Sequence, residues 1–310
     1  MKTRFRYLFG PVPSRRFGRS LGVDLIPHKT CSLDCVFCQL GQTSNKTTIR
    51  KEYTPTADVL SEIDNWFASD GRADFITLSG SGEPTLHSKF GKILEYIKTK
   101  TDIPSLLLTN GSLLHLPEVR EAASVASTIK ISLSAWHQAS FEWVNRPPPQ
   151  LNFDQLLEGQ KSFRKQYKGQ LYLEVFLVPG MNAMPKDVRK IARLAKEIAP
   201  DRIQLNTAVR PSSEDFVTPL PRDRMEKLTR LFEPKAEIIA DYQAPFPERG
   251  EAGLEMIVNM LQRRPCTSKQ IAAGLGIHLN SVLKYLNTLM QTHPIHTKHA
   301  NNKVYYLLQE

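Results

Sequence analysis

Short apolar runs alternate with helical segments along most of the chain, and this alternation restricts the fold more than any other feature. The runs rich in strand-forming residues are Leu21–Pro27, Phe75–Ser79, Ser105–Thr109, Thr128–Ser134, Leu171–Val178 and Arg202–Ala208. The segments with helical spacing are Thr56–Ser69, Lys89–Lys100, Pro117–Ala126, Phe153–Tyr167, Lys186–Ile198 and Arg222–Leu231. Nearly continuous apolar strands joined by helices are typical of a parallel sheet that is covered on both faces. The pattern predicts an α/β fold built from six βα units.

Small or polar residues follow every predicted strand, and they help to choose between two α/β architectures. These strand exits are His28–Thr30, Gly80–Glu83, Asn110–Gly111, Ala135–His137, Pro179–Asn182 and Arg210–Ser213. In parallel α/β folds the carboxyl ends of the strands meet at one rim, where ligands bind. All six exits can share a rim more easily in a curved sheet than in a doubly wound one. We therefore predict a partial (β/α)6 TIM-like barrel over residues 20–235.

The alternation ends near Ala236, and the rest of the chain has a different pattern. Residues 236–250 read as a linker, because two prolines, a glycine and scattered charges lie close together. Three helices and two short strands are expected after it: Glu251–Gln262, a helix capped by Thr267 or Ser268, His278–Met290, Ile295–Thr297 and Val304–Leu308. This order predicts a small winged-helix domain over residues 251–310.

The charge balance is basic and uneven. The 310 residues include 41 Lys and Arg against 31 Asp and Glu, which gives a net charge of +10. Residues 1–19 form a predicted basic N-terminal arm. A phosphate-rich partner would explain the excess, and a solvated basic face would explain it equally well.

Two broad classes of protein are not expected from this composition. The chain contains no long uninterrupted apolar stretch of the kind that spans a bilayer, so we expect no membrane segment. The basic start has no apolar segment behind it, so we expect no secretory signal. Three of the four cysteines lie within eight residues, which is a poor framework for disulfides. We therefore expect the protein in the reducing cytoplasm.

The clustered cysteines Cys31, Cys35 and Cys38 come directly after the first predicted strand. Three thiolates on one loop suit a four-iron cluster in which the fourth iron stays open to a cofactor. Structural zinc sites also use closely spaced cysteines, but they normally need a fourth ligand. His28 and Cys266 are conceivable fourth ligands. The spacing by itself leaves both interpretations open.

Two motifs of the chain resemble those of the radical S-adenosylmethionine (SAM) superfamily, and the resemblance covers about residues 20–235. One is the cysteine loop with Phe37 just before its last cysteine, and the other is the segment Gly80–Pro84 after the second strand. The resemblance implies a 4Fe–4S cluster on the three cysteines and SAM as the second cofactor. It also implies that Phe37 packs near the adenine, and that Gly82 and Glu83 lie near the methionyl group.

A closer resemblance is found in residues 10–24 and 35–41, which are similar to the branch related to wyosine-type transfer-RNA synthases. The family resemblance implies that a 5′-deoxyadenosyl radical abstracts a hydrogen atom from the substrate. Together with the basic charge, it favours a macromolecular substrate, with RNA (tRNA in particular) ahead of protein. A flavodoxin or ferredoxin would supply the electron. Two alternatives are an activase that installs a radical on a partner enzyme, and a DNA-binding regulator whose cluster senses redox state.

Polar residues on the later strands are weaker candidates for cofactor contacts. Ser132 and Ser134 alternate with apolar neighbours and so share one face of the fourth strand. They are either cofactor contacts or ordinary strand hydroxyls satisfied by the backbone. Glu174 lies within the apolar fifth strand, where a carboxylate is unfavourable unless it is paired. It is either a contact to the ribose or the substrate, or half of an internal ion pair.

Overall fold

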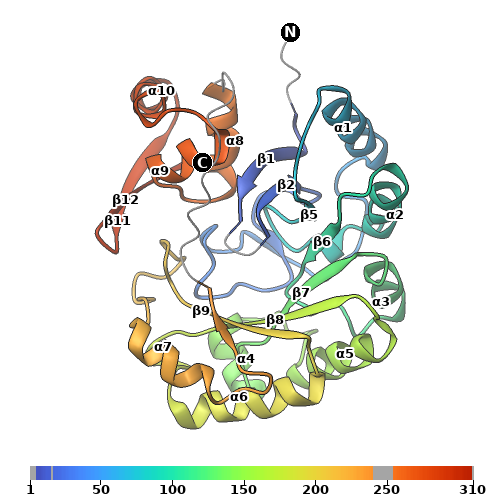
Figure 1. The fold of residues 1–310 in the computed structure, drawn as a ribbon. Coiled ribbons are helices and arrows are strands. Elements are labelled where there is room, and N and C mark those ends of the chain that lie inside the picture. The colour runs from blue at the N-terminus through green and yellow to red at the C-terminus, as the bar shows by residue number, and fades with distance from the viewer. Residues whose placement is uncertain (1–4, 15–16, 240–253, 309–310) are drawn as a thin grey trace.

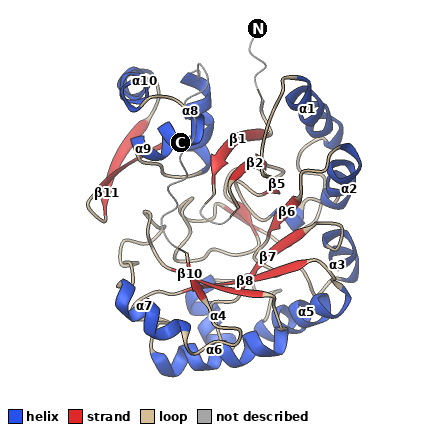
Figure 2. Ribbon diagram, in the orientation of Figure 1, coloured by secondary structure: helices blue, strands red, loops and turns tan. Residues whose placement is uncertain are grey.

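The computed structural model describes residues 5–14, 17–239 and 254–308. Its main sheet contains eight strands in the order β1-β2-β5-β6-β7-β8-β9-β10. Their bounds are Leu8–Pro13, Arg19–Val23, Phe75–Leu78, Ser105–Leu108, Thr128–Ser132, Gln170–Phe176, Arg202–Asn206 and Glu237–Ile238. Every neighbouring pair is parallel except β1 and β2, which are antiparallel. The strands follow one another around a curve, with β1 at one edge and β10 at the other (Figures 1 and 2).

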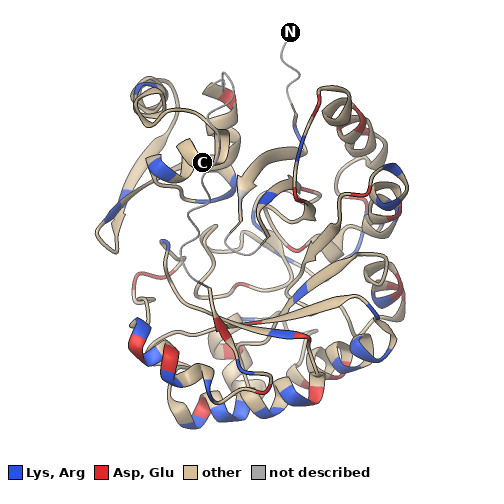
Figure 3. Ribbon diagram, in the orientation of Figure 1, with Lys and Arg blue, Asp and Glu red and all other residues tan. Residues whose placement is uncertain are grey.

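Helices cover the outside of this curved sheet (Figures 1 and 2). They are α1 (Thr56–Ala68), α2 (Phe90–Lys100), α3 (Pro117–Ala123), α5 (Phe153–Gln166), α6 (Pro185–Ile198) and α7 (Arg222–Thr229). In α6 the buried residues Val188, Ile191, Ala195 and Ile198 recur at helical spacing and face the sheet. Basic and acidic residues are interleaved along α6 and α7 (Figure 3). The outer faces of these two helices are therefore ordinary solvated surfaces. The core lies between the helices and the strands.

The predicted α/β alternation is confirmed: each of the six expected strands and six expected helices is present, with small shifts at the ends. The elements that were not predicted are β1, β10, α4 (Gln138–Asn145) and the short β3 (Thr30–Cys31), β4 (Asn45–Lys46) and η1 (Pro84–Leu86). The segment that forms β1 lies within the predicted N-terminal arm and contains two prolines. Proline is tolerated there because β1 is an edge strand, and its pairing with β2 shifts register between Phe9 and Val12.

A C-terminal unit, residues 254–308, follows the main sheet. It consists of α8 (Leu254–Arg263), α9 (Ser268–Leu275), α10 (Leu279–Thr292) and an antiparallel hairpin of β11 (Ile295–Ala300) and β12 (Lys303–Leu308). Thr267 caps α9 through a capping box with Gln270. Gly276 ends α9 with φ of +64°, which glycine adopts without strain. Most of the predicted linker 236–250 and the first residues of the helix expected from Glu251 lie outside the described residues.

The C-terminal unit lies across the side on which the main sheet stays open (Figure 1). At one end, Val12 of β1 shares a buried cluster with residues of α8 and α9. At the other end, the Tyr305 hydroxyl donates to the Val209 carbonyl at 2.8 Å, and Asn301 Nδ2 donates to the Ala208 carbonyl at 3.2 Å. The unit thus connects the first strand of the curve with the loop after β9. In the described ranges, no helix has the length and apolar character needed to cross a membrane.

Candidate functional site

The cysteine loop begins at β3 (Thr30–Cys31), which pairs with β4 (Asn45–Lys46). The loop lies against the end of α4, because the Asp34 N–H donates to the Asn145 carbonyl at 3.0 Å and the Val36 N–H donates to the Val144 carbonyl at 3.1 Å. Within the loop, the Cys38 N–H donates to the Cys35 carbonyl at 3.0 Å. The backbone of the loop is therefore fixed by hydrogen bonds to the barrel and to itself.

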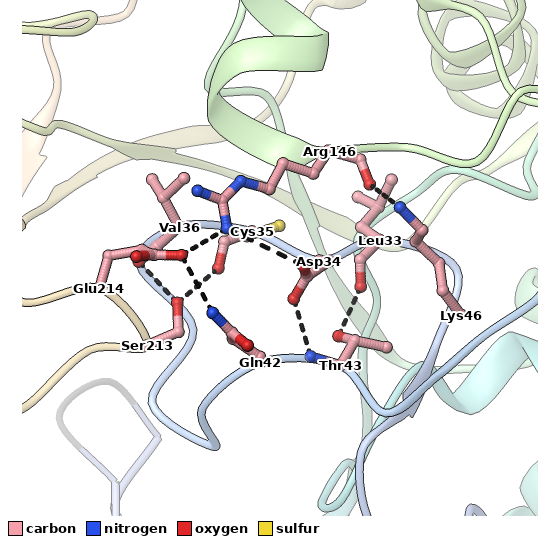
Figure 4. Close-up of polar contacts among 10 residues, drawn as sticks. All are labelled: Leu33, Asp34, Cys35, Val36, Gln42, Thr43, Lys46, Arg146, Ser213 and Glu214. Atoms are coloured by element: carbon pink, nitrogen blue, oxygen red, sulfur yellow. Dashed lines mark hydrogen bonds and ion pairs between the residues drawn. The ribbon is translucent and has the colours of Figure 1, made fainter.

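Side chains from two other parts of the rim contact the cysteine loop (Figure 4). Arg146 forms ion pairs with Glu214 and with Asp34, the latter at 3.9 Å. The Ser213 hydroxyl donates to the Val36 carbonyl at 2.7 Å. The contacts come from the loop after β9 and from the end of α4, so the cysteine loop joins two parts of the rim that are distant in sequence.

Two asparagine side chains donate to cysteine sulfurs. Asn145 Nδ2 lies 3.2 Å from Cys35 Sγ, and Asn110 Nδ2 lies 3.6 Å from Cys31 Sγ. Burial raises the pKa of all three thiols, to about 12 for Cys35. The thiols are thus protonated at neutral pH in the metal-free protein. A bound metal would displace these protons, and the asparagine donors suit a thiolate.

The three cysteines do not converge on a single metal ion. Across residues 5–14, 17–239 and 254–308, no three His, Cys, Asp or Glu side chains are placed to hold one metal ion. A four-iron cluster does not require such convergence, because each thiolate binds a different iron. Cys266, the fourth cysteine, is fully buried in the core of the C-terminal unit.

The Gly80–Glu83 segment is hydrogen-bonded directly to the start of the cysteine loop. The Lys29 N–H donates to the Ser81 carbonyl at 2.8 Å, and the Glu83 N–H donates to the Thr30 carbonyl at 3.2 Å. A Cβ atom on Gly82 would lie 1.7 Å from the Thr30 carbonyl oxygen. Glycine is therefore required at this position for the two loops to approach each other.

The carboxylate of Glu83 is buried and accepts several hydrogen bonds within the protein. It caps the short helix η1 (Pro84–Leu86) by accepting from the Thr85 N–H. It also accepts from the Thr109 hydroxyl at 2.6 Å and from the Asn110 N–H at 2.7 Å. Asn110 in turn approaches the Cys31 sulfur. Glu83 therefore positions the loop after β6 beside the cysteine loop.

Phe37, Ser132 and Ser134 are brought together around a small cavity of about 80 Å³, which Cys35 also lines. The ring of Phe37 stacks on Phe176 with centroids 4.1 Å apart. Ser134 Oγ accepts from the Phe176 N–H at 3.0 Å, and Ser132 Oγ accepts from Lys130 Nζ at 3.3 Å. Both serines have partners within the protein, and their face is also open to a cavity beside a cysteine.

Glu174 lines a separate and larger cavity, of about 340 Å³, inside the curve of the sheet. Its carboxylate lies 3.5 Å from Lys130 Nζ and accepts from Asn206 Nδ2 at 3.2 Å. Cys38 lines the same cavity from the cysteine loop. The ion pair that we considered is present, and it faces a space large enough for part of a ligand.

Several residues of the site were missed at the level of sequence. Lys130, between two buried isoleucines of β7, carried a signal, because a charge inside an apolar strand usually has a partner or a ligand. Asn110 was noted only as a strand exit. Asn145 lies on the unpredicted helix α4. Arg264 carried no local signal at all, because only the packing of the C-terminal unit brings it to the cavity.

The family model described as the Radical SAM superfamily matches residues 25–203, which is more than half of the chain. The chain belongs to the radical SAM superfamily. Members of this superfamily use a 4Fe–4S cluster and SAM. When bound, these groups supply a 5′-deoxyadenosyl radical that takes a hydrogen atom from the substrate. The radical SAM match includes the cysteine loop, Gly80–Glu83 and Glu174.

Similar curated proteins come from distant bacteria and archaea. A protein of Brachyspira hyodysenteriae named GTPase Obg is 34% identical over 98% of this chain, which spans only 45% of that protein. UPF0026 protein MJ1312 of Methanocaldococcus jannaschii is 30% identical over 90% of each chain. A UPF0026 protein of Helicobacter pylori is 32% identical over 98% of each chain.

Solved structures show the same fold at low sequence identity. The structure of TYW1 with a lysine-pyruvate adduct bound has a TM-score of 0.51 at 16% identity and covers 74% of this chain and 76% of its own. Streptococcus suis SuiB has a TM-score of 0.52 at 16% identity and covers 70% of this chain and 48% of its own. At these identities the likeness concerns the fold alone.

Proposed function

We propose that this radical SAM enzyme holds its cluster on Cys31, Cys35 and Cys38 and uses the 5′-deoxyadenosyl radical to modify RNA in the cytoplasm. The observation that carries the reaction class is the cysteine loop at the rim of the barrel, joined by backbone hydrogen bonds to Gly80–Glu83. Flavodoxin or ferredoxin would supply the electron. Here this chain positions the cofactors and excludes water, and the cofactors supply the radical.

The residues around the cysteines would then have distinct roles. Gly82 would let SAM approach the rim, and Glu83 would act by holding Asn110 beside Cys31. Phe37, Ser132 and Ser134, which line the small cavity beside Cys35, would contact one edge of the nucleoside part of SAM. Glu174 would meet the ribose or the substrate from the larger cavity. Apart from Gly82, which acts through its backbone, each role uses a side chain that lines one of the two cavities or fixes a neighbour that does.

RNA is supported as the substrate by the basic charge of the chain and by the basic residues that line the cavity inside the barrel. These residues are Lys130, Arg210, Arg263 and Arg264. With about 340 Å³, that cavity has room for a single nucleotide and none for a duplex. An RNA substrate would therefore present one unstacked nucleotide. The C-terminal unit has the element order of a winged helix. Its third helix α10 contains Lys284 as its one basic residue, so we expect RNA affinity to come from the barrel rim more than from this helix.

The alternatives have less support. An activase would need a partner enzyme, and nothing about the described surface identifies one. A DNA-binding regulator without chemistry does not agree with membership of a superfamily of enzymes. The wyosine reaction itself is not proposed, because Cys266 is the one cysteine outside the loop and a second cluster would need more.

An anaerobic cleavage assay tests the proposal. The cluster is reconstituted in the full chain, reduced, and given SAM with bulk cellular RNA, with RNase-digested RNA, or with no RNA. We expect 5′-deoxyadenosine in all three, and more of it with intact RNA. Equal amounts with intact and digested RNA would refute the RNA substrate, and no 5′-deoxyadenosine at all would refute the radical reaction.

A further inference from the structure

Two cavities lie between the cysteine loop and the C-terminal unit, and they share part of their walls. The first is the cavity of about 340 Å³ inside the barrel. The second has a volume of about 400 Å³ and extends toward the hairpin β11–β12. Gln39, Leu40 and Arg264 line both cavities. Arg264 therefore lies at the boundary between the cavity inside the barrel and the cavity beside the hairpin β11–β12.

The walls of the two cavities are strongly basic. The cationic residues that line them are Lys29, Lys130, Arg210, Arg263, Arg264 and Lys298. Glu174 is the one carboxylate among the described lining residues. Such an excess of positive charge around a partly enclosed space creates a potential that attracts anions.

Most of these cations have a partner inside the protein. The ion pairs are Lys130–Glu174, Arg263–Asp24 and Lys298–Asp215. Arg210 Nη1 donates to Gln39 Oε1 at 2.9 Å. These internal contacts explain why four positively charged residues occur here, and no bound ligand is needed to explain them.

Two side-chain nitrogens of Arg264 lack a contact of this kind within the described residues. Its Nε and Nη2 atoms are buried from solvent, and neither has a hydrogen-bond partner anywhere in the part of the chain that the structure describes. Two buried guanidinium nitrogens without a partner are unfavourable, and native proteins rarely keep such atoms without a reason. A negatively charged ligand in the cavities that Arg264 lines would remove the penalty when the side chain turns these nitrogens toward it.

The position of Arg264 is fixed by its neighbours. The Arg264 N–H donates to the Met260 carbonyl of α8 at 3.2 Å. The preceding residue, Arg263, is held by the ion pair between its Nε and Asp24 Oδ2 at 2.9 Å. The backbone of Arg264 is thus held at the C-terminal end of α8, beside both cavities.

We propose that these two cavities bind a phosphate group of the substrate, and that Arg264 is its main protein ligand. The planar guanidinium matches phosphate with two parallel hydrogen bonds. The proposal rests on the proposed function and adds the group by which the substrate is recognised. It also gives the C-terminal unit a direct part in the site, because that unit supplies Arg264.

Binding measurements on the full chain with its reconstituted cluster test the proposal. The probes are the four nucleoside 5′-monophosphates, the matching nucleosides, inorganic phosphate and SAM, each titrated at low salt. The variant is Arg264→Gln, and the matched control is Arg224→Gln on the exposed face of α7. We expect at least one 5′-monophosphate to bind more tightly than its nucleoside, and Arg264→Gln to weaken it about tenfold or more. Binding of inorganic phosphate without binding of any 5′-monophosphate would overturn the proposal, because the site would then take a free anion and not a phosphate group of a substrate.

Folding stability separates a binding role from a structural one. If Arg264 serves to bind a ligand and not to stabilise the fold, Arg264→Gln should leave the melting temperature of the ligand-free protein unchanged or higher. A clear fall in melting temperature, with unchanged nucleotide affinity, would overturn the proposal. An equal loss of SAM affinity would also overturn it, since it would assign Arg264 to the SAM carboxylate.

The outcomes are distinct from those of the function assay. If no 5′-monophosphate or phosphate binds the wild-type protein, the phosphate site is refuted, whereas RNA-stimulated SAM cleavage would still support the proposed function. If phosphate binding depends on Arg264 and RNA never stimulates cleavage, the site stands and the substrate is a smaller phosphate ester.

Discussion

Arg263 and Asp24 form a buried ion pair that joins the C-terminal unit to the end of strand β2. Arg263 Nε lies 2.9 Å from Asp24 Oδ2, and both side chains are at least nine-tenths buried. Asp24 also accepts from the Ser81 N–H at 3.0 Å and from the Ser81 hydroxyl at 2.6 Å. One carboxylate therefore connects β2, the loop beside Gly80 and α8.

We expect Arg263→Ala to destabilise the protein by about 3 kcal/mol or more, because it leaves the Asp24 charge buried without its cation. Urea unfolding measures the change. The matched control is Arg222→Ala, whose ion pair with Glu226 is exposed on α7 and which should cost about 0.5 kcal/mol or less. Equal losses in the two variants would show that the buried pair contributes no more than a surface pair.

We expect Cys35→Ala to abolish the visible absorbance of the reconstituted cluster and SAM cleavage together. The control is Cys266→Ala, because Cys266 lies in the core of the C-terminal unit and should be dispensable for both. Iron and sulfide contents, measured beside the spectrum, check the result. A full cluster in Cys35→Ala would show that the ligands are wrongly assigned.

We expect Asn145→Leu to make the cluster potential more negative. The Asn145 side chain donates to Cys35 Sγ at 3.2 Å, and such a donor stabilises the more negative, reduced cluster. A net hydrogen bond of about 1 kcal/mol corresponds to about 40 mV for one electron. A redox titration followed by electron paramagnetic resonance measures the shift. Asn65→Leu, on the exposed surface of α1, should leave the potential where it is, and a positive shift in Asn145→Leu would contradict the prediction.

We expect the protein to lose stability as the pH falls below about 6.5, partly because of His87. Burial lowers the pKa of His87. Its Nε2 lies 2.9 Å from the Thr54 carbonyl, and its Nδ1 accepts from the Lys89 N–H, so the neutral ring is required. The unfolded chain binds the proton at higher pH than the folded chain does. The stabilisation is therefore complete above the unfolded pKa and is lost as the pH falls through the folded one.

Unfolding midpoints at pH 7 and pH 5 check this prediction. One titrating group contributes less than about 1.4 kcal/mol per pH unit. His87→Gln, which cannot titrate in this range, should show a smaller difference between the two pH values than the wild-type protein. A difference of the same size would mean that other groups account for the acid sensitivity.

The sequence predicted those parts of the molecule that depend on local pattern. The apolar runs marked β2 and β5 to β9, and the cysteine spacing marked the loop at the rim. The strand β1 was missed because Pro11 and Pro13 disfavour a strand, and only its place at the sheet edge makes them acceptable.

The partners of the site residues could not be predicted, because they come from distant segments. Glu83 was expected near the methionyl group, a role that stays a prediction. Its hydrogen bonds to Thr109 and Asn110 depend on the neighbouring strand β6. Arg264 reaches the cavity only through the packing of α8 on β1. A local pattern contains no information about such contacts.

The contact of Tyr305 with the Val209 carbonyl has a consequence for the order of assembly. The C-terminal unit follows the cysteine loop in the chain and therefore leaves the ribosome after it. During synthesis the cysteines are therefore accessible to iron delivery before any cover exists. In the folded protein the C-terminal unit lies across the open side of the sheet, so iron delivered during synthesis and a substrate that binds afterwards meet different surroundings at the cysteine loop.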